Sequence, residues 1–415
     1  MKRIAKHPRV SRIFGLLSLF CFLLYARAQN APAAVYLLRG TQVFDGESMH
    51  PGWVVLVRND RIAGAGPAAN ITAPPDAKTI DLPGATLMPG LIEAHSHVLL
   101  HPYNETSWND QNAHESLAVR VARATVHLHR TLMAGFTTIR DLGTEGAGYA
   151  DVGLKQAVEQ GIIPGPRMIV VTRAIVATGS YGPKGFAAEW TVPQGAEEAS
   201  GNDVIRVVRD QIGHGADWIK IYADYRWGLN NQAAPTFSED EIRLMVETAR
   251  SSGRAVAAHA TTAEGMRRAA MAGVETIEHG DNGTAEIFRL MKEKGASYIP
   301  TLSTGGPNNE RKKAVFKLAL ESGVTIGSGS DVGVFPHGDE AREIELLGAF
   351  GMPALDALKA ATSIDAKLLH MEDRIGRIKE GLLADLIAVD GDPSKDLARL
   401  HSIKLVMKNG TIYKE

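Results

Sequence analysis

The stretch Thr86-Leu87-Met88-Pro89-Gly90-Leu91-Ile92-Glu93-Ala94-His95-Ser96-His97 joins an apolar run to a pair of histidines. On a β-strand, residues i and i+2 point to the same face, so the imidazoles of His95 and His97 can reach one ion. Two histidines that share a face at the end of an apolar strand are costly to bury without a common partner. Taken alone, the pair leaves a metal site and two ordinary polar residues equally open.

Seven further apolar runs follow this stretch, and segments with a helical pattern separate most of them. Such alternation is typical of parallel strands covered by helices. After the first run, 86–88 leading into His95, the predicted strands are 137–141, 168–172, 218–222, 255–259, 276–279, 297–300 and 325–331. These units in residues 89–375 predict an α/β fold of the (β/α)8 TIM barrel type, which carries its chemistry at the C-terminal ends of the strands.

The two ends of the chain share a different pattern. Residues 36–87 alternate apolar and polar side chains between turn residues, and the same alternation returns in 385–389 and 403–413. Short strands bounded by turns are typical of a small antiparallel sheet. We therefore expect residues 34–88 and 376–415 to form one composite β-sandwich domain beside the barrel.

The N-terminus is predicted to be a signal peptide, residues 1–28. A basic region precedes the apolar stretch 13–25, and Ala26-Arg27-Ala28 has the small residues of a cleavage site. That apolar stretch is too short to cross a bilayer as a helix, so we expect cleavage, no stable membrane span afterwards, and a periplasmic or secreted enzyme. Lipid anchoring at Cys21 is the alternative, although Phe20 fits it poorly. Cys21 is the only cysteine, so the mature chain would have no disulfide or thiol ligand.

The composition points to a small substrate. The 415 residues include 45 basic and 47 acidic side chains, for a formal net charge of −2. A chain with no basic excess offers no field for nucleic acid, so we expect no nucleic-acid partner. The predicted partner is a small molecule or dipeptide, attracted by charges near the site.

Four later residues interrupt or close predicted strands as the histidine pair does. Lys220 lies inside the otherwise apolar run 218–222, where an unpaired buried cation is expensive; an ordinary salt bridge is the alternative. His259, His279 and Asp331 each end a later run. Each one alone is more often a satisfied polar residue than a ligand. Together with the histidine pair, the set favours a metal site at one end of the barrel.

This set resembles the binuclear, carboxylated-lysine form of the amidohydrolase superfamily, with His-x-His after strand one, Lys on strand four, His on strands five and six, and Asp on strand eight. The resemblance covers nearly the whole mature chain and extends to the phrases at 137–143, 277–280, 327–331 and 376–386. Within the superfamily, the chain is similar to metal-dependent Xaa-Pro dipeptidases and carboxypeptidase-like amidohydrolases, a group that includes the ochratoxin-hydrolysing amidases.

The resemblance implies two divalent metal ions. The ligands that it implies are, for the more buried ion, His95, His97 and Asp331 and, for the other, His259 and His279. Lys220 would bridge both ions as N6-carboxylysine, formed with CO2. Nitrogen and oxygen ligands without sulfur suit zinc first, with iron, cobalt and manganese as alternatives. The implied reaction is hydrolysis by a hydroxide shared between the ions, with Asp331 carrying a proton to the leaving amine.

The residues that would contact substrate are less regular. Tyr222 follows Lys220 by two residues and is a candidate hydrogen-bond donor to the developing oxyanion, with barrel packing as the alternative. The turn at 177–182 resembles a family Thr-Gly-Gly-His-Gly loop, but Ser180 and Tyr181 stand where that pattern has Gly and His. This departure puts in doubt the transfer of a carbonyl-polarising histidine to this chain.

Other polar residues allow two interpretations. Candidates to bind a substrate carboxylate are Arg140, Arg226 and His337, and an ion-pair or structural role is the alternative for each. His127 and His129 lie in a helical stretch and diverge at their i, i+2 spacing, so they are predicted to face solvent.

Three functions remain open from the sequence. The first is hydrolysis of a C-terminal amide or imide bond of dipeptides or N-acyl amino acids, with ochratoxin A as one candidate. The second is a broad lactonase or esterase that uses the same site, and the third is a metal-free binding protein without catalysis. The presence of all six ligand positions argues against the third. Because homologous barrels often assemble as dimers to octamers, the resemblance also implies a homo-oligomer.

Overall fold

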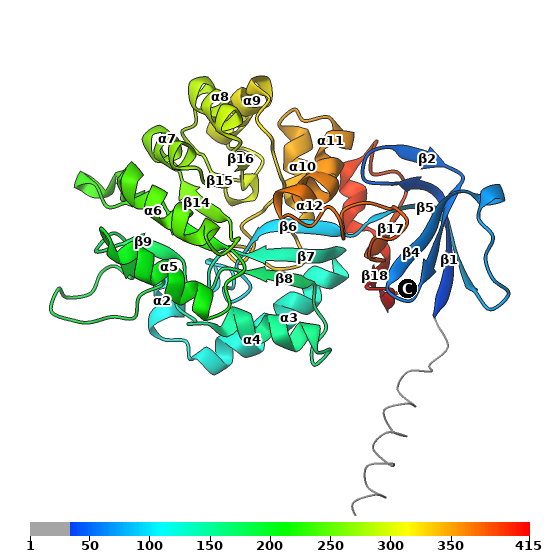
Figure 1. Cartoon of the computed structure of the whole chain (residues 1–415), viewed down its shortest axis with the longest axis horizontal. Helices are drawn as coiled ribbons and strands as arrows, with labels where there is room; N and C mark the ends of the chain where they lie inside the picture. Colours follow the sequence, from blue (N-terminus) through cyan, green and yellow to red (C-terminus); the bar gives the residue numbers. More distant parts are fainter. Residues whose placement is uncertain (1–33) are drawn as a thin grey trace, which may run out of the picture.

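The computed structural model describes residues 34–415. The signal peptide predicted for residues 1–28 lies outside the described residues. A barrel surrounded by helices and a smaller twisted sheet lie side by side, and the sheet combines the first and last strands of the chain (Figure 1). The expected fold class, a barrel with a β domain built from both chain ends, is confirmed.

The small sheet has eight strands, in the order β19-β18-β17-β5-β1-β3-β4 with β2 paired to β1. Their bounds are β1 Val35–Phe44, β2 Met49–Pro51, β3 Trp53–Arg58, β4 Arg61–Pro67, β5 Lys78–Pro89, β17 Leu386–Asp390, β18 Ile403–Lys408 and β19 Thr411–Lys414. Strand β17 runs antiparallel to β5, and β5 runs parallel to β1. At the far edge of the sheet, Arg61 pairs with Leu383 just before β17, so the sheet bends around its own apolar core.

The barrel strands pair in parallel as β6-β7-β8 and β9-β11-β14-β15-β16. Their bounds are β6 Leu91–Ser96, β7 Phe136–Asp141, β8 Arg167–Val170, β9 Ile175–Ala177, β11 Ile219–Tyr222, β14 Val256–Ala260, β15 Thr276–His279 and β16 Ser297–Ile299; β10 Glu197–Ala199 extends β9, and β12 Asp224–Arg226 pairs with β13 Ala233–Pro235. The carbonyl of Val170 accepts from the N–H of Trp218 and joins the two sheets. Bridges from Tyr298 to Ile326 and from Ser96 to Val332 close the barrel.

Two predicted strand positions differ from the structure. Residues 86–88 belong to β5 of the small sheet, and the first barrel strand begins only at Leu91, after Pro89-Gly90. The run 325–331 is not a regular strand: Ile326 forms an isolated bridge with Tyr298, and Val332, just after the run, forms one with Ser96. A Cβ on Gly329 would lie 2.8 Å from the backbone nitrogen of His95, so the two segments approach more closely than side chains on a regular strand would allow.

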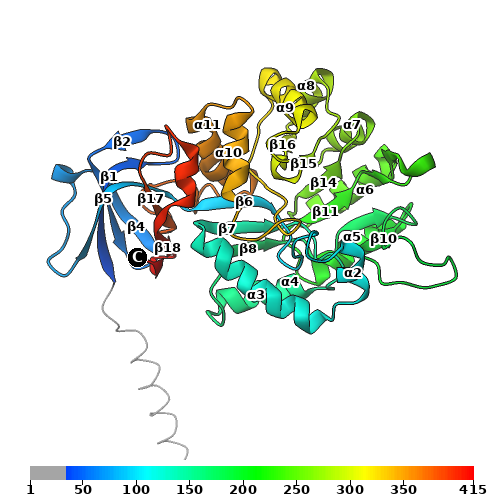
Figure 2. The same ribbon diagram turned by 180° about the vertical axis from the view of Figure 1, so that it is seen from behind.

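Helices cover the outside of the barrel (Figures 1 and 2). Their bounds are α2 Trp108–Ala113, α3 Leu117–Met133, α4 Ala150–Glu159, α5 Asp203–Gly213, α6 Glu239–Arg250, α7 Ala263–Ala272, α8 Ala285–Lys294, α9 Glu310–Ser322, α10 Ala341–Ala349, α11 Ala354–Lys359 and α12 Asp365–Leu368. Helix α6 is representative: Ser238 and Glu241 form a capping box at its start, and Ile242, Met245 and Ala249 bury one face. These packed faces fix the strand ends that carry the site.

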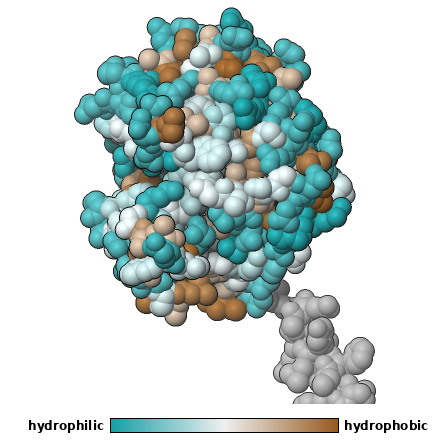
Figure 3. Space-filling model, turned by 90° about the vertical axis from the view of Figure 1, so that its left-hand side faces the viewer, coloured by the Kyte–Doolittle hydropathy of each residue, from teal (hydrophilic) through white to brown (hydrophobic). Residues whose placement is uncertain are grey.

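Among residues 34–415, no helix is long and apolar enough to cross a membrane. On the face of the barrel opposite the small sheet, most of the surface is hydrophilic and apolar residues form scattered patches (Figure 3).

Candidate metal centre

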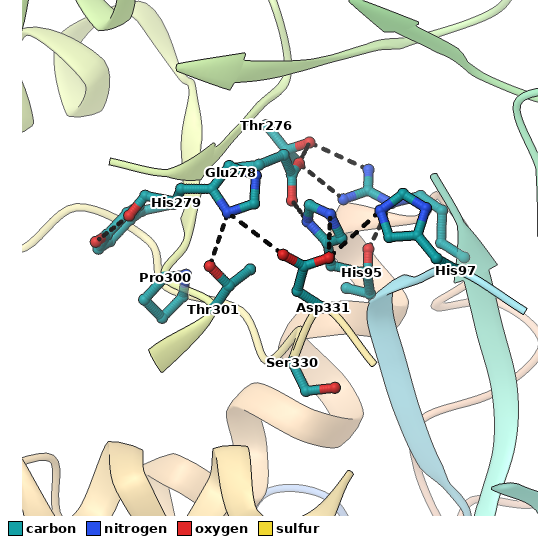
Figure 4. A network of polar contacts seen from close by, with 12 residues as sticks. His95, His97, Thr276, Glu278, His279, Pro300, Thr301, Ser330 and Asp331 are labelled. Carbon is teal, nitrogen blue, oxygen red and sulfur yellow. Dashed lines mark hydrogen bonds and ion pairs between the residues drawn. The ribbon is translucent and has the colours of Figure 1, made fainter. Parts of the chain in front are cut away.

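Three of the predicted ligands meet where the first and last barrel strands end. His95 lies near the end of β6, His97 follows that strand, and Asp331 lies in the segment that closes the barrel. Asp331 Oδ1 is 3.6 Å from His95 Nε2 and 3.4 Å from His97 Nε2 (Figure 4). The ligand atoms of the three residues lie within 4.8 Å of one another. These separations are long for direct hydrogen bonds and leave room for a cation between the groups.

His259 and His279 come from the neighbouring strands β14 and β15. His279 Nδ1 is 3.9 Å from Asp331 Oδ2, and the His279 ring centroid is 4.5 Å from that of His259 and 5.0 Å from that of His95. They lie beside the compact group of three rather than inside it. His279 and Asp331 have φ angles of 70° and 65°. Such angles strain a non-glycine residue and are concentrated at functional sites.

Lys220 lies on β11, which pairs with β14. Its side chain is fully buried, and Nζ has no hydrogen-bond partner among the described residues. Burial lowers the pKa of Lys220 to about 8. A neutral amine is therefore accessible near physiological pH, and this is the form that can add CO2. We call His95, His97, Lys220, His259, His279 and Asp331 the ligand group.

A buried network of three side chains supports the ligand group. Glu278 accepts hydrogen bonds from His95 Nδ1 at 2.8 Å, from Arg140 Nη2 at 3.0 Å and from Thr276 Oγ1 at 2.6 Å. Because the carboxylate accepts, the proton of His95 lies on Nδ1, and Nε2 offers its lone pair toward Asp331. We call Arg140, Thr276 and Glu278 the support network.

The other imidazoles also present lone pairs. His97 Nδ1 donates to the carbonyl of Gly143 at 3.0 Å, which leaves Nε2 as an acceptor. Burial is the main cause that lowers the pKa well below its ordinary value in His95, His259 and His279. Neutral imidazoles are the form that binds metal. Burial also raises the pKa of Asp331.

The residues present fit divalent metal ions. Within the part of the chain that the structure describes, His95 Nε2 and Lys220 Nζ are buried without a hydrogen-bond partner. Buried polar atoms are nearly always paired, so such atoms indicate a partner that the protein chain itself does not supply. All donors in the ligand group are nitrogen or oxygen, a set that zinc and related first-row ions accept.

Beside the ligand group, a buried carboxylate gathers aromatic donors. Glu145 Oε2 accepts from the Tyr181 hydroxyl at 2.6 Å and from Trp108 Nε1 at 2.8 Å. Its Oε1 accepts from the Tyr222 hydroxyl over a longer 3.3 Å. The Tyr222 ring stacks on His259 with centroids 4.5 Å apart. Tyr181, which replaces the histidine of the resembling loop, is therefore linked through Glu145 to the ligand group.

Two neighbouring cavities open at this end of the barrel. One, of about 670 Å³, has His259, His279 and Asp331 in its wall. The other, of about 420 Å³, is lined by Trp108 and Tyr181. Their shared wall residues are Tyr103, Tyr225, Arg226 and Asn231. The end of the barrel that carries the ligand group therefore has room for an organic substrate with aromatic groups.

Of the five predicted substrate-binding residues, Tyr181 and Arg226 line these cavities, and three do not. Arg140 is fully buried and donates to the Ala94 carbonyl, Thr276 and Glu278. Its guanidinium is already hydrogen-bonded inside the barrel, so it cannot bind a substrate carboxylate. Ser180 is also fully buried and donates to the Ala177 carbonyl at 2.7 Å, so it stabilises the turn.

His337 is the third candidate that the structure places elsewhere. Its side chain is buried, with Nε2 3.3 Å from the His97 carbonyl and its ring stacked on His127 at 4.4 Å. The expectation that His127 faces solvent is wrong, because its position in α3 falls on the buried face and its Nδ1 donates to the Val98 carbonyl. His129 is exposed, as expected. The two stacked rings hold the backbone that follows β6.

Sequence reasoning missed two acidic residues that organise the site. Glu278 stands inside the apolar run 276–279, where a carboxylate needs a buried partner. Glu145 follows β7 between glycines, at the strand end where a barrel carries its chemistry. Each position was a usable signal, but the partners are remote in sequence: Arg140 is 138 residues from Glu278.

The chain is similar to amidohydrolases of known sequence and structure. Residues 86–413 match the Amidohydrolase family. The ochratoxinase of Aspergillus niger is 29% identical over 381 residues, which cover 79% of this chain and 75% of that protein. A Xaa-Pro dipeptidase structure with bound methionine in the active site has a TM-score of 0.82 and 30% identity, covering 92% of this chain and 100% of that one. The A. niger ochratoxinase structure has a TM-score of 0.78 and 26% identity, with coverage of 92% and 96%.

Proposed function

We propose, from the premise that this chain belongs to the amidohydrolase family and is a hydrolase acting on amide bonds, that it is a binuclear metal-dependent enzyme. Its substrates are dipeptides or N-acyl amino acids, and it cleaves their C-terminal amide or imide bond. Cleavage of Xaa-Pro dipeptides and of the amide bond of ochratoxin A are included in this proposal.

One observation carries the proposal: the ligand group contains buried atoms that no protein group satisfies. His95 Nε2 and Lys220 Nζ have no partner in the described residues, and both come from side chains that burial makes costly to leave unpaired. A protein that used this pocket only for packing would gain stability by replacing such groups with apolar ones.

Two divalent ions, zinc first, fit the ligand group. His95, His97 and Asp331 would hold the more buried ion, and His259 and His279 the other. Lys220 would bridge them as N6-carboxylysine, because carboxylation by CO2 converts a repelling ammonium into an anionic oxygen ligand. When bound, the ions supply Lewis acidity to the scissile carbonyl and lower the pKa of the attacking water.

The chain itself supplies proton transfer and substrate orientation. Asp331 would take a proton from the attacking water and deliver it to the leaving amine. Burial raises the pKa of this carboxyl. Tyr222 is the candidate donor to the carbonyl oxygen. Tyr181 lines the aromatic part of the cavity, and Arg226, in the wall shared by both cavities, is the candidate to receive the substrate carboxylate.

The proposal includes an exported protein whose signal peptide is removed after residue 28, and a homo-oligomer. The signal peptide is supported by the N-terminal sequence, in which basic residues precede an apolar stretch.

The direct test is a substrate panel on protein loaded with zinc and bicarbonate. Xaa-Pro, Xaa-Arg and Xaa-Phe dipeptides, N-acyl aromatic amino acids and ochratoxin A are compared by kcat/KM with lactones and simple esters. We expect the amide substrates to give the highest values. Higher values for lactones or esters would replace the proposal with the lactonase or esterase function, and inactivity toward all substrates would refute an enzyme.

A further inference from the structure

Glu145 is a buried carboxylate in strained backbone next to the ligand group. Its φ is 47° and its exposed fraction is 3%. A non-glycine residue in the left-handed region costs energy that the surrounding fold must offset, and such residues are concentrated at functional sites. The reaction steps described above give this residue no role.

Glu145 contacts both flanks of the ligand group. A Cβ on Gly143 would lie 3.5 Å from Glu145 Oε1 and 3.9 Å from His97 Cε1, so the carboxylate and this histidine are neighbours across a glycine. On the other flank, the Tyr222 hydroxyl donates to the same oxygen and its ring stacks on His259. The charge of Glu145 therefore lies close enough to act on a substrate bound at the ligand group.

The two oxygens of Glu145 are unequally used. Oε2 accepts two short bonds, from Tyr181 and Trp108, whereas among residues 34–415 Oε1 accepts only the 3.3 Å contact from Tyr222. That distance is long for an O–H donor, and a carboxylate offers about four lone-pair sites. Burial, reinforced by the charge of Glu145, raises the pKa of both phenols, which keep their protons. Oε1 can accept a further, stronger donor.

The positively charged side chains near Glu145 compete little with a substrate ammonium group for its carboxylate. Buried Arg120 lies behind the loop and donates to the carbonyls of Leu99 and Thr144. Arg226 and Lys184 are exposed at the cavity wall, where solvent and salt screen their charges. The rings of Tyr103, Trp108, Tyr181 and Tyr225 line the cavity of about 420 Å³, and two of them, Tyr181 and Trp108, donate to Glu145. A buried anion beside aromatic faces is the environment that attracts an ammonium group.

We propose that Glu145 selects substrates with a free α-ammonium group on the N-terminal side of the scissile bond, so that dipeptides are preferred over N-acyl amino acids. This inference rests on the proposed function and narrows its substrate class. An ammonium N–H that donates to Oε1 replaces the long contact from Tyr222. The released phenol can then donate to the substrate carbonyl oxygen, so recognition of the amine also prepares the oxyanion donor.

The test compares substrates that differ only in the amine. L-alanyl-Xaa dipeptides are paired with N-propionyl-Xaa, where Xaa is each leaving residue of the panel, and the ratio of the two kcat/KM values is measured. We expect the native protein to favour the dipeptide by at least about tenfold, since a site built for a hydrogen-bond donor rejects an analogue without it. In Glu145→Gln the ratio should fall toward one. Tyr181→Phe keeps the carboxylate and should keep the preference.

A binding measurement decides the inference without turnover. L-alaninamide and propionamide are titrated calorimetrically into the zinc-loaded full chain and into Glu145→Gln. Tighter binding of L-alaninamide that disappears in the variant supports the inference; equal binding of the two amides by the native protein overturns it. If all the pairs are inert, the proposed function fails while the binding result still stands.

Folding of the variants is checked by circular dichroism. If Glu145→Gln does not fold, Glu145→Asp and Glu145→Asn replace it, because Asp and Asn tolerate positive φ and differ from each other in charge. A preference for the amine in the Asp variant and not in the Asn variant supports charge recognition. The same ratio in both would contradict it.

Discussion

The ligand group and the support network share strand β15 and are joined by the hydrogen bond from His95 to Glu278, yet their buried atoms are paired differently. In the support network, Arg140 donates to three acceptors and one Glu278 oxygen receives two donors. In the ligand group, Lys220 Nζ and His95 Nε2 have no partner among the described residues. The difference is visible within one side chain: His95 Nδ1 is bound to Glu278, and Nε2 on the same ring is not.

Whether a buried charged group has a hydrogen-bond partner in the protein therefore distinguishes a structural role from a binding role. A closed network such as Arg140 and Glu278 stabilises geometry and loses stability when either partner is removed. Buried atoms without a partner among the described residues, such as His95 Nε2 and Lys220 Nζ, add no stability until a further group binds. We therefore propose that the ligand group is maintained to bind metal, whereas the support network is maintained to hold the ligand group in place.

The largest expected effect is on activity after loss of the lysine bridge. Lys220→Ala should lower kcat by more than about a thousandfold and reduce bound metal, because the anionic bridging ligand is lost. Short carboxylic acids should restore part of the activity, measured by steady-state kinetics with and without added acetate. Full activity of Lys220→Ala without additive would refute the carboxylated lysine.

Removing the proton carrier is expected to have the next largest effect. Asp331→Asn retains one oxygen donor and should keep part of the metal, while kcat falls by about a hundredfold to ten-thousandfold, the range of general acid–base catalysis. Kinetics and metal analysis on the same preparation separate these two effects. Native turnover in this variant would place the proton transfer at another residue.

Breaking the support network should affect stability more than chemistry. Glu278→Gln leaves Arg140 buried without its counter-charge and should lower the free energy of unfolding by about 3–5 kcal/mol. Metal affinity should fall by about tenfold to a hundredfold, because His95 loses a charged acceptor. Denaturant unfolding and metal titration measure the two quantities.

A surface pair provides the control for that variant. Arg206 and Asp203 form an exposed i, i+3 ion pair, so Asp203→Asn should leave the unfolding midpoint unchanged. An equal loss of stability in both variants would show that the buried network contributes no more to stability than an exposed ion pair.

A second buried lysine, Lys408, predicts the smallest effect, a pH dependence of stability. Lys408 in β18 donates to the Gly165 carbonyl, and burial lowers its pKa to about 8 from 10.5. Between these two values the unfolded chain binds more protons than the folded one, so this lysine makes stability rise with pH from about 8 to 10.5. Below pH 8 the full penalty of the buried cation remains.

Lys408→Met should remove this contribution. Relative to the variant, the native protein should gain stability as pH rises through that window, measured by urea unfolding at several pH values. Parallel curves for the two proteins would show that Lys408 does not titrate differently on folding.

The sequence anticipates that the residues of the ligand group lie together, because each of them stands out within or at the end of an apolar run. His95 and His97 share one face of a strand end, Lys220 interrupts an apolar run, and His259, His279 and Asp331 end later runs. The parallel barrel then brings all strand ends to one side, whatever their distance along the chain.

Substrate contacts are less predictable because they depend on loops between strands. Trp108, Glu145 and Tyr181 come from three separate connections and meet only in the folded barrel. Arg140 has the residue type of a carboxylate receptor, but its direction is set by Glu278 and Thr276, which lie 138 and 136 residues away. No pattern within one strand encodes such a direction.

Metal content tests the central claim most directly. The native chain, purified and supplied with zinc and bicarbonate, is measured by elemental analysis beside Lys220→Met, which keeps the volume of the side chain and removes its nitrogen. We expect about two metal ions per native chain, as in other two-metal sites, and clearly fewer ions per chain in the variant. A native chain that holds well under one ion would contradict it.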